Sequence, residues 1–229
     1  MFLPLKDRKP LKNIPFQVVT VSVIVACIAV FLWQTSLPEH AGDVFILGYG
    51  TIPAVLFDVK ALIPELFRVP VKLTLITSMF LHGRWWHLIG NMLYLWVFGD
   101  NVEDTMGSRR FVIFYLITGI AAALAHAAIN PQLTAAMVGA SGAISGIMGA
   151  YLVLYPRVKV LALIFNHIPL RLPAYVLLVD WVVFQLFSAS GGGSTTWWAH
   201  TGGFLTGGFL TGAVLVAPFR YKSVPLFDR

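Results

Sequence analysis

Residues 139–155 read GASGAISGIMGAYLVLY, and the pattern of this segment indicates how the chain folds. It has no charged side chain, and its glycines recur every three or four residues, at Gly142, Gly146 and Gly149. That spacing places small residues along one face of a helix. A helix from Gly142 to Tyr155 is about 21 Å long, shorter than the roughly 30 Å hydrocarbon core of a bilayer. The sequence therefore predicts a short membrane helix whose N-terminus, at Ser141, lies below the outer surface.

The composition of the whole chain agrees with a membrane location. Of 229 residues, 58% are apolar and 11% are charged, whereas soluble domains carry roughly 25% charged residues. The 14% of aromatic residues exclude a disordered chain, and the single cysteine excludes a disulfide framework. An ordinary water-soluble globule is thus excluded, and a polytopic membrane protein is indicated.

Six apolar segments predict helices that cross or enter the bilayer. They cover approximately Phe16–Trp33, Trp86–Phe98, Phe111–Ile129, Gly142–Tyr155, Pro173–Phe187 and Trp197–Ala217. We expect the first to be a retained helix, because its apolar run is longer than that of a signal peptide. The predicted fold is an all-α bundle of six transmembrane helices. Residues 1–15 form an N-terminal segment, residues 16–217 the membrane domain and residues 218–229 a C-terminal tail.

The distribution of basic residues predicts the orientation. With the N-terminus inside, cytoplasmic segments hold twelve lysines and arginines, and outer segments hold four. Since basic residues resist translocation, both termini are expected in the cytoplasm. The short N-terminal segment and the six-helix core favour a bacterial inner membrane. The net charge of +6 then reflects topology and requires no nucleic-acid partner. The first outer loop, Leu37–Trp85, is too long for a simple connector and is expected to fold at the outer interface.

Four polar residues occur early in helices that run from outside to inside: His87, Asn91, Ser141 and His200. At that position they share one outer layer of the bundle, and polar groups in a membrane interior usually face the bundle or a watery cavity. A helix N-terminus at Ser141 also offers free N–H groups that suit an oxyanion. The alternative is that each residue only makes hydrogen bonds between helices.

Glycines connect the fourth and sixth predicted helices. Gly142 and Gly146 on one helix, with Gly203 and Gly207 on the other, allow close backbone approach. His200 lies three residues before Gly203, on roughly the same face. Close packing of the two helices could therefore bring the imidazole of His200 within reach of Ser141.

Three short motifs resemble those of one known family. Residues 139–142 (GASG) resemble the GxSG motif of rhomboid intramembrane serine proteases, and residues 199–203 with Gly207 resemble their AHxxGxxxG motif. Residues 87–91 (HLIGN) are similar to their HxxxN motif. The motifs follow one another in the family's order and lie on the corresponding predicted helices.

The resemblance implies a Ser-His dyad that needs no metal or cofactor. Ser141 would be the nucleophile that forms an acyl-enzyme, and His200 would be its base. His87, Asn91 and the backbone N–H of Ser141 would form the oxyanion hole. The implied partners are the lipid bilayer and single-spanning membrane proteins, which would be cut in or near the membrane.

Several alternatives remain open at this point. The chain could be a catalytically silent relative that binds and directs transmembrane clients, although such relatives commonly lack the serine or the histidine. A small transporter is disfavoured because no inverted repeat is visible. Ser145 is interpreted as a packing serine, and Asp180, a carboxylate within a predicted helix, could orient His200. The sequence does not indicate an oligomeric state.

A gate for the substrate is also suggested by the resemblance. Trp181 and Phe184, at the outward end of the fifth predicted helix, and the glycine run at residues 191–193 could let that helix or an outer cap move. The alternative is a flexible connector beside lipid-facing aromatic side chains.

Overall fold

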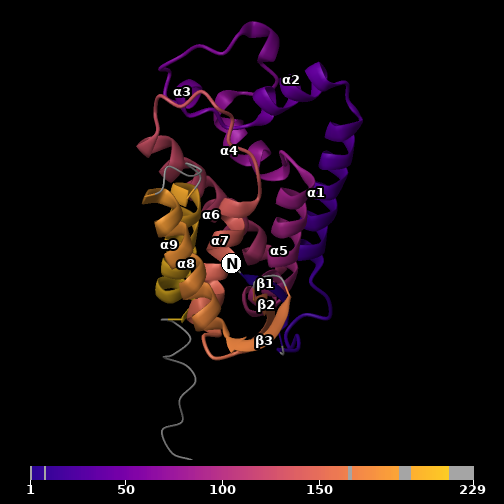
Figure 1. The fold of residues 1–229 in the computed structure, drawn as a ribbon, viewed down its shortest axis with the longest axis vertical. Coiled ribbons are helices and arrows are strands. Elements are labelled where there is room, and N and C mark those ends of the chain that lie inside the picture. Colours follow the sequence, from indigo (N-terminus) through magenta and orange to yellow (C-terminus); the bar gives the residue numbers. More distant parts are fainter. Residues whose placement is uncertain (1, 8, 165–166, 191–196, 217–229) are drawn as a thin grey trace, which may run out of the picture.

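The computed structural model describes residues 2–7, 9–164, 167–190 and 197–216. Helices make up most of the chain (Figure 1). The long ones are α1 (Val18–Ser36), α5 (Trp85–Met106), α6 (Ser108–Ile129), α7 (Ser141–Leu154), α8 (Ala174–Ser190) and α9 (Trp197–Leu210). A π-helical segment, η4 (Thr211–Val216), continues α9. The predicted gate residues 191–193 and C-terminal tail 218–229 lie outside the described residues.

Each of the predicted helical segments coincides with one of these helices. Two of the described helices, α1 and α6, are long and apolar enough by length and composition to cross a membrane, and α7 and α8 contain shorter apolar stretches. The prediction for α5 was too short, because it ended at Phe98, where charged residues begin. The helix continues to Met106 because Glu103 and Asp104 are almost completely buried and hydrogen-bonded.

These two carboxylates attach the N-terminal segment to α5. The carboxylate of Glu103 accepts hydrogen bonds from the backbone N–H groups of Val19 (3.0 Å) and Thr20 (2.8 Å), in the first turn of α1. Those N–H groups have no partner within their own helix, so Glu103 caps α1. Asp104 accepts from the backbone N–H groups of Lys12, Asn13 and Ile14. The position of α1 is therefore fixed by the end of α5.

A three-stranded antiparallel sheet corrects the prediction of an all-α fold. Its strands are β1 (Phe2–Asp7), β2 (Lys159–Ile164) and β3 (Ile168–Pro173), in the order β1-β2-β3. In β2, the alternate residues Val160 and Ala162 are fully buried, which is the period of a strand with one covered face. The segment between α7 and α8 therefore folds as a hairpin, and the N-terminal segment adds the third strand.

The remaining short elements gather at the end of the molecule opposite the sheet (Figure 1). They are α2 (Glu39–Tyr49), α3 (Pro53–Leu56), η1 (Pro64–Leu66), η2 (Val71–Leu73), α4 (Thr74–Thr77) and η3 (Ser78–Phe80). All belong to the long loop that the sequence marks between the first two long helices, and this loop holds the segment before α7 in place. Thr51 and Met137 exchange backbone hydrogen bonds of 2.8 and 3.1 Å, and Gly139 N–H donates to the carbonyl of Ser78 (2.8 Å).

Candidate active site

Ser141 and His200 meet at the start of α7. The Oγ atom of Ser141 lies 2.9 Å from Nε2 of His200, which is the fourth residue of α9. Hydroxyl and imidazole are thus within hydrogen-bond distance, although 59 residues separate them in the chain. In this arrangement the imidazole is able to take the proton of the hydroxyl as the oxygen becomes a nucleophile.

Glycine residues on α9 allow this helix to approach α7 closely enough for His200 to reach Ser141. A Cβ atom on Gly203 would overlap the carbonyl oxygen of Gly142, and one on Gly207 would overlap that of Gly146. Two glycines of α7 serve a different neighbour, since Cβ atoms on Gly142 and Gly146 would collide with side chains of α6. Glycine therefore lets α7 lie against two helices at once, with Ser141 held beside His200.

Gln185 is a partner of His200 that the sequence analysis missed. Its side-chain oxygen Oε1 lies 2.9 Å from Nδ1 of His200. An Nδ1–H that donates to this oxygen leaves Nε2 as the acceptor for the hydroxyl of Ser141. The available signal was a polar amide among the few polar side chains of a mainly apolar helix. Asp180, which the sequence suggested for this position, is exposed and forms no hydrogen bond with His200 among the described residues.

The aromatic residues of α8 lie in different surroundings. Trp181 is 8% exposed, and its ring centroid lies 5.6 Å from that of His200 and 6.1 Å from that of Phe204. It therefore forms a wall beside the imidazole. Phe184 is 44% exposed. The proposal that these two residues act as a gate stays a prediction.

Asn91 and His87 lie on α5 across from the start of α7. The side-chain nitrogen of Asn91 is buried and has no hydrogen-bond partner among the described residues. Buried polar groups are rarely left unpaired, so this donor is available for a group that enters the site. His87 stands beside Gly139, where a Cβ atom would come within 2.6 Å of the imidazole Cε1. Gly139 also has a φ of +122°, which explains why glycine precedes Ser141 by two positions.

His82 packs against the imidazole ring of His87. It is fully buried, and the two rings meet edge to face with centroids 5.2 Å apart. Ser145, one turn further along α7 than Ser141, is also buried and donates its hydroxyl to the carbonyl of Ser141 at 2.6 Å. Neither His82 nor Ser145 takes part in the contact between Ser141 and His200. In the described part of the chain, no group of three or more His, Cys, Asp or Glu side chains has a geometry that would hold a metal ion.

Two cavities meet at Ser141. One, of about 460 Å³, opens between the loop before α7, Arg84 at the start of α5, and His200. The other, of about 280 Å³, lies between α5 and α8 and is lined by Trp86, Tyr94, Trp181 and Gln185. His87, Ser141 and His200 line both cavities. The hydroxyl of Ser141 is therefore accessible from two directions.

Comparison with known proteins places these residues in a family. The family model for the rhomboid domain matches residues 70–218, which include His87, Asn91, Ser141, Gln185 and His200. The chain is 33% identical over 145 residues to rhomboid protein 1, mitochondrial, of Saccharomyces cerevisiae, an alignment that covers 59% of this chain and 40% of the yeast protein.

Two further relatives are similar over shorter stretches. The chain is 39% identical over 88 residues to rhomboid protease GluP of Bacillus subtilis, covering 33% of this chain and 17% of GluP. It is 37% identical over 78 residues to rhomboid-like protein 11, chloroplastic, of Arabidopsis thaliana, covering 34% of this chain and 28% of that protein. The chain thus spans less than half the length of each of these relatives.

Proposed function

The chain belongs to the rhomboid family, and on this premise we propose that it is a serine endopeptidase that cleaves membrane proteins within or near their transmembrane segments. Its long helices would form a six-helix membrane domain, with both termini in the cytoplasm. The observation that carries this proposal is the 2.9 Å separation between Ser141 Oγ and His200 Nε2. The protease name of the relative GluP supports the same reaction class.

In the proposed mechanism, His200 acts first as a base and then as an acid. Nε2 takes the proton of Ser141 as Oγ attacks the carbonyl carbon of the scissile peptide bond. The same nitrogen returns the proton to the leaving amine, which produces an acyl-enzyme on Ser141. Water then attacks the ester, again with His200 as base. Gln185, as the partner of Nδ1, keeps the imidazole in the orientation that both steps require.

The charge on the tetrahedral intermediate would be stabilised by donors that have no other partner in the part of the chain that the structure describes. The side-chain nitrogen of Asn91 is one such donor. The backbone N–H of Ser141 is a second, because Ser141 is the first residue of α7 and its N–H has no partner within the helix. His87 lines both cavities beside Ser141 and would supply a third.

The two cavities suggest separate routes for substrate and water. The cavity between α5 and α8 is bounded by Trp86, Tyr94 and Trp181, so it suits an apolar segment that arrives from the side. The cavity beneath the loop before α7 is lined by Arg84 and residues 136–139, so it suits water that arrives from the α2–α4 end. The substrate route serves formation of the acyl-enzyme on Ser141, and the water route serves its hydrolysis.

A cleavage assay with paired serine variants tests the proposal. Purified protein is reconstituted with a single-spanning reporter that has small residues at its cleavage site. We expect Ser141→Ala to form no product and Ser145→Ala to retain activity. Ser145 is a matched control because it lies one turn from Ser141 on the same helix. Equal activity in Ser141→Ala and the parent protein would reject the mechanism. An inactive but folded parent protein that still binds the reporter would instead identify a silent relative that directs transmembrane clients.

A further inference from the structure

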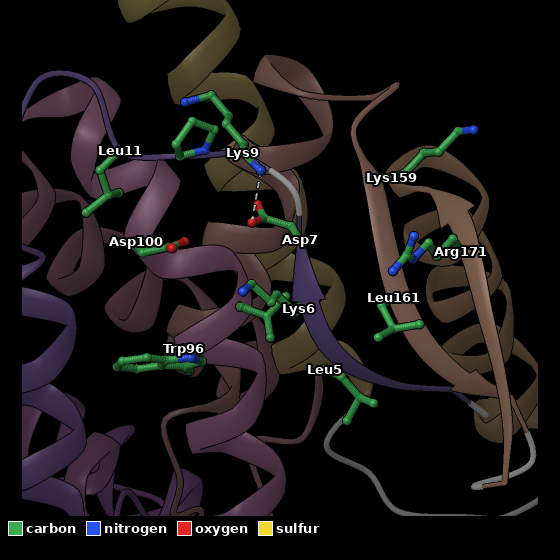
Figure 2. Close-up of a pocket in the computed structure, with 12 residues that line it drawn as sticks. Leu5, Lys6, Asp7, Lys9, Leu11, Trp96, Asp100, Lys159, Leu161 and Arg171 are labelled. Atoms are coloured by element: carbon green, nitrogen blue, oxygen red, sulfur yellow. Dashed lines mark hydrogen bonds between the residues drawn. The ribbon is translucent and has the colours of Figure 1, made fainter.

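A separate cleft lies at the sheet end of the molecule. It has a volume of about 740 Å³ and is enclosed by β1, the hairpin β2–β3 and the second half of α5 (Figure 2). Trp96 and Asp100 of α5 line it, and these residues are five and nine positions beyond Asn91. The cleft is therefore about one to three helical turns away from the proposed catalytic layer.

The strand register brings cations together in this cleft. Lys6 of β1 and Arg171 of β3 both pair with Leu161 of β2, so their side chains lie on one face of the sheet. Lys159 is two residues from Leu161 and shares that face. All three cationic residues are exposed. Within the described ranges, none of their charged groups forms an ion pair or a hydrogen bond with a carboxylate.

The acidic residues of the cleft already have partners. Asp7 Oδ2 accepts hydrogen bonds from the hydroxyl of Tyr151 (2.6 Å) and the side-chain nitrogen of Asn101 (2.7 Å). Asp100 Oδ1 accepts from the backbone N–H of Asn101 (2.6 Å). Burial raises the pKa of Asp7, although its hydrogen bonds and the nearby lysines lower it in part. The cleft thus has satisfied carboxylates and unsatisfied cations.

The other end of the cleft is apolar. Figure 2 shows Lys9 and Lys159 toward one end, and Leu5 and Trp96 toward the other. Trp96 is 48% exposed and Leu5 is 37% exposed. Exposed apolar side chains continue along α5 to Ile89, on the side of the helix that also carries Trp96. Tryptophan at such a boundary is typical of the interface between membrane and water.

We propose that this cleft binds an anionic phospholipid, with the headgroup phosphate at Lys6, Lys159 and Arg171 and the acyl chains against Trp96. A charged group joined to a long apolar tail matches the two ends of the cleft. An acidic peptide would match only the basic end. Basic residues on the cytoplasmic side also set the topology, but this role does not require three cations to line one cleft. Arg109 and Arg110 fulfil it without forming a cleft.

Quenching of tryptophan fluorescence by brominated lipids tests this assignment. Full-length Ser141→Ala protein, in which proteolysis plays no part, is placed in phosphatidylcholine vesicles that contain a minor fraction of either brominated phosphatidylglycerol or brominated phosphatidylcholine. The signal of Trp96 is the difference from a matched Trp96→Phe protein. We expect brominated phosphatidylglycerol to quench this signal at a much lower fraction than brominated phosphatidylcholine.

Charge variants identify the residues that attract the lipid. In the variant Lys6→Gln/Lys159→Gln/Arg171→Gln, the preference for phosphatidylglycerol should fall by about fivefold per charge removed. The control Arg109→Gln/Arg110→Gln/Arg157→Gln removes the same charge from exposed positions outside the cleft and should keep the preference. The variant Lys6→Arg/Lys159→Arg/Arg171→Lys, which keeps every charge, should also keep it.

Three results would overturn the proposal. Equal quenching by the two brominated lipids would show that the cleft does not select anionic headgroups. If the cleft variant and the control variant lost the preference for phosphatidylglycerol equally, the lipid would be attracted only to the overall positive charge of the protein surface. Complete displacement by soluble glycerol phosphate would assign the cleft to a free phosphate compound. The lipid result is independent of catalysis, since the experiment uses the Ser141→Ala protein.

Discussion

The side-chain oxygen of Gln185 lies 2.9 Å from Nδ1 of His200, on the side of the imidazole opposite Ser141. The three residues come from α8, α9 and α7, so the proposed base is held between two helices. An imidazole whose two nitrogens both have partners keeps one tautomer and one orientation. This relationship gives the proposed dyad a third, uncharged member.

Gln185→Ala should lower kcat by about 10- to 100-fold, because it leaves the partly buried Nδ1–H of His200 without an acceptor, a loss of about 1–3 kcal/mol. Gln185→Glu keeps an acceptor oxygen and should recover most of the activity. The measurement is the cleavage rate of a membrane reporter at saturating concentration. A parent-like kcat in Gln185→Ala would show that His200 needs no such partner.

Asn91→Ala should reduce the cleavage rate by about 10²- to 10³-fold, because the loss of a single oxyanion donor costs about 2.7–4 kcal/mol in the transition state. The variant should fold normally, since the Asn91 nitrogen has no partner among the described residues. Single-turnover cleavage and thermal unfolding are measured on the same preparation. If the rate is unchanged, Asn91 does not contact the oxyanion.

Gly203→Ala should separate α9 from α7, because the new Cβ would overlap the carbonyl oxygen of Gly142, a backbone atom that cannot move alone. Overpacking of this kind typically costs about 1–3 kcal/mol. It should also lengthen the contact between Ser141 and His200 and therefore reduce activity. The matched control is Gly212→Ala, where a Cβ would meet nothing within 4 Å. Activity and unfolding temperature are compared for the two, and equal values would contradict the packing account.

Glu103→Gln should lower stability by about 1–3 kcal/mol, because the amide replaces an acceptor oxygen that faces the N–H groups of α1. Glu103 is fully buried and also accepts from the hydroxyl of Ser108 at 2.6 Å. Glu65→Gln, at an exposed position, is the control. The measurement is the unfolding midpoint in detergent, and no difference between the two variants would show that this cap is unimportant.

Much of the helical arrangement could be predicted, because apolar runs of the required length leave few other structures in lipid. The approach of Ser141 to His200 was also predictable, since Gly203 and Gly207 specify a close helix contact. The end of α5 could not be predicted. A glutamate such as Glu103 is expected to be exposed to solvent, and only its hydrogen bonds to α1 explain why it is buried. Gln185 was missed for a related reason, since its partner is remote in sequence.

The sheet was missed because its two parts are far apart in the chain. Buried and exposed residues alternate in the hairpin segment β2, as in a strand. The hairpin lies between two helices, however, where basic residues favour the interpretation as a cytoplasmic loop. Strand β1 pairs with β2 across about 160 residues, as in the pair Phe2 and Ile164. Such a contact has no local signal in the sequence. The same pairing creates the cleft at Lys6 and Arg171, so this feature also required the structure.

Covalent labelling with a fluorophosphonate probe tests whether Ser141 is a nucleophile activated by His200. The probe reacts with a serine whose hydroxyl is activated by a base, so peptide mass spectrometry after labelling identifies the nucleophile. We predict a single modified serine, Ser141, with labelling lost in His200→Ala and retained in Ser145→Ala. Absence of label on Ser141 in folded protein, or label that persists unchanged in His200→Ala, would contradict the assignment of a Ser141–His200 dyad.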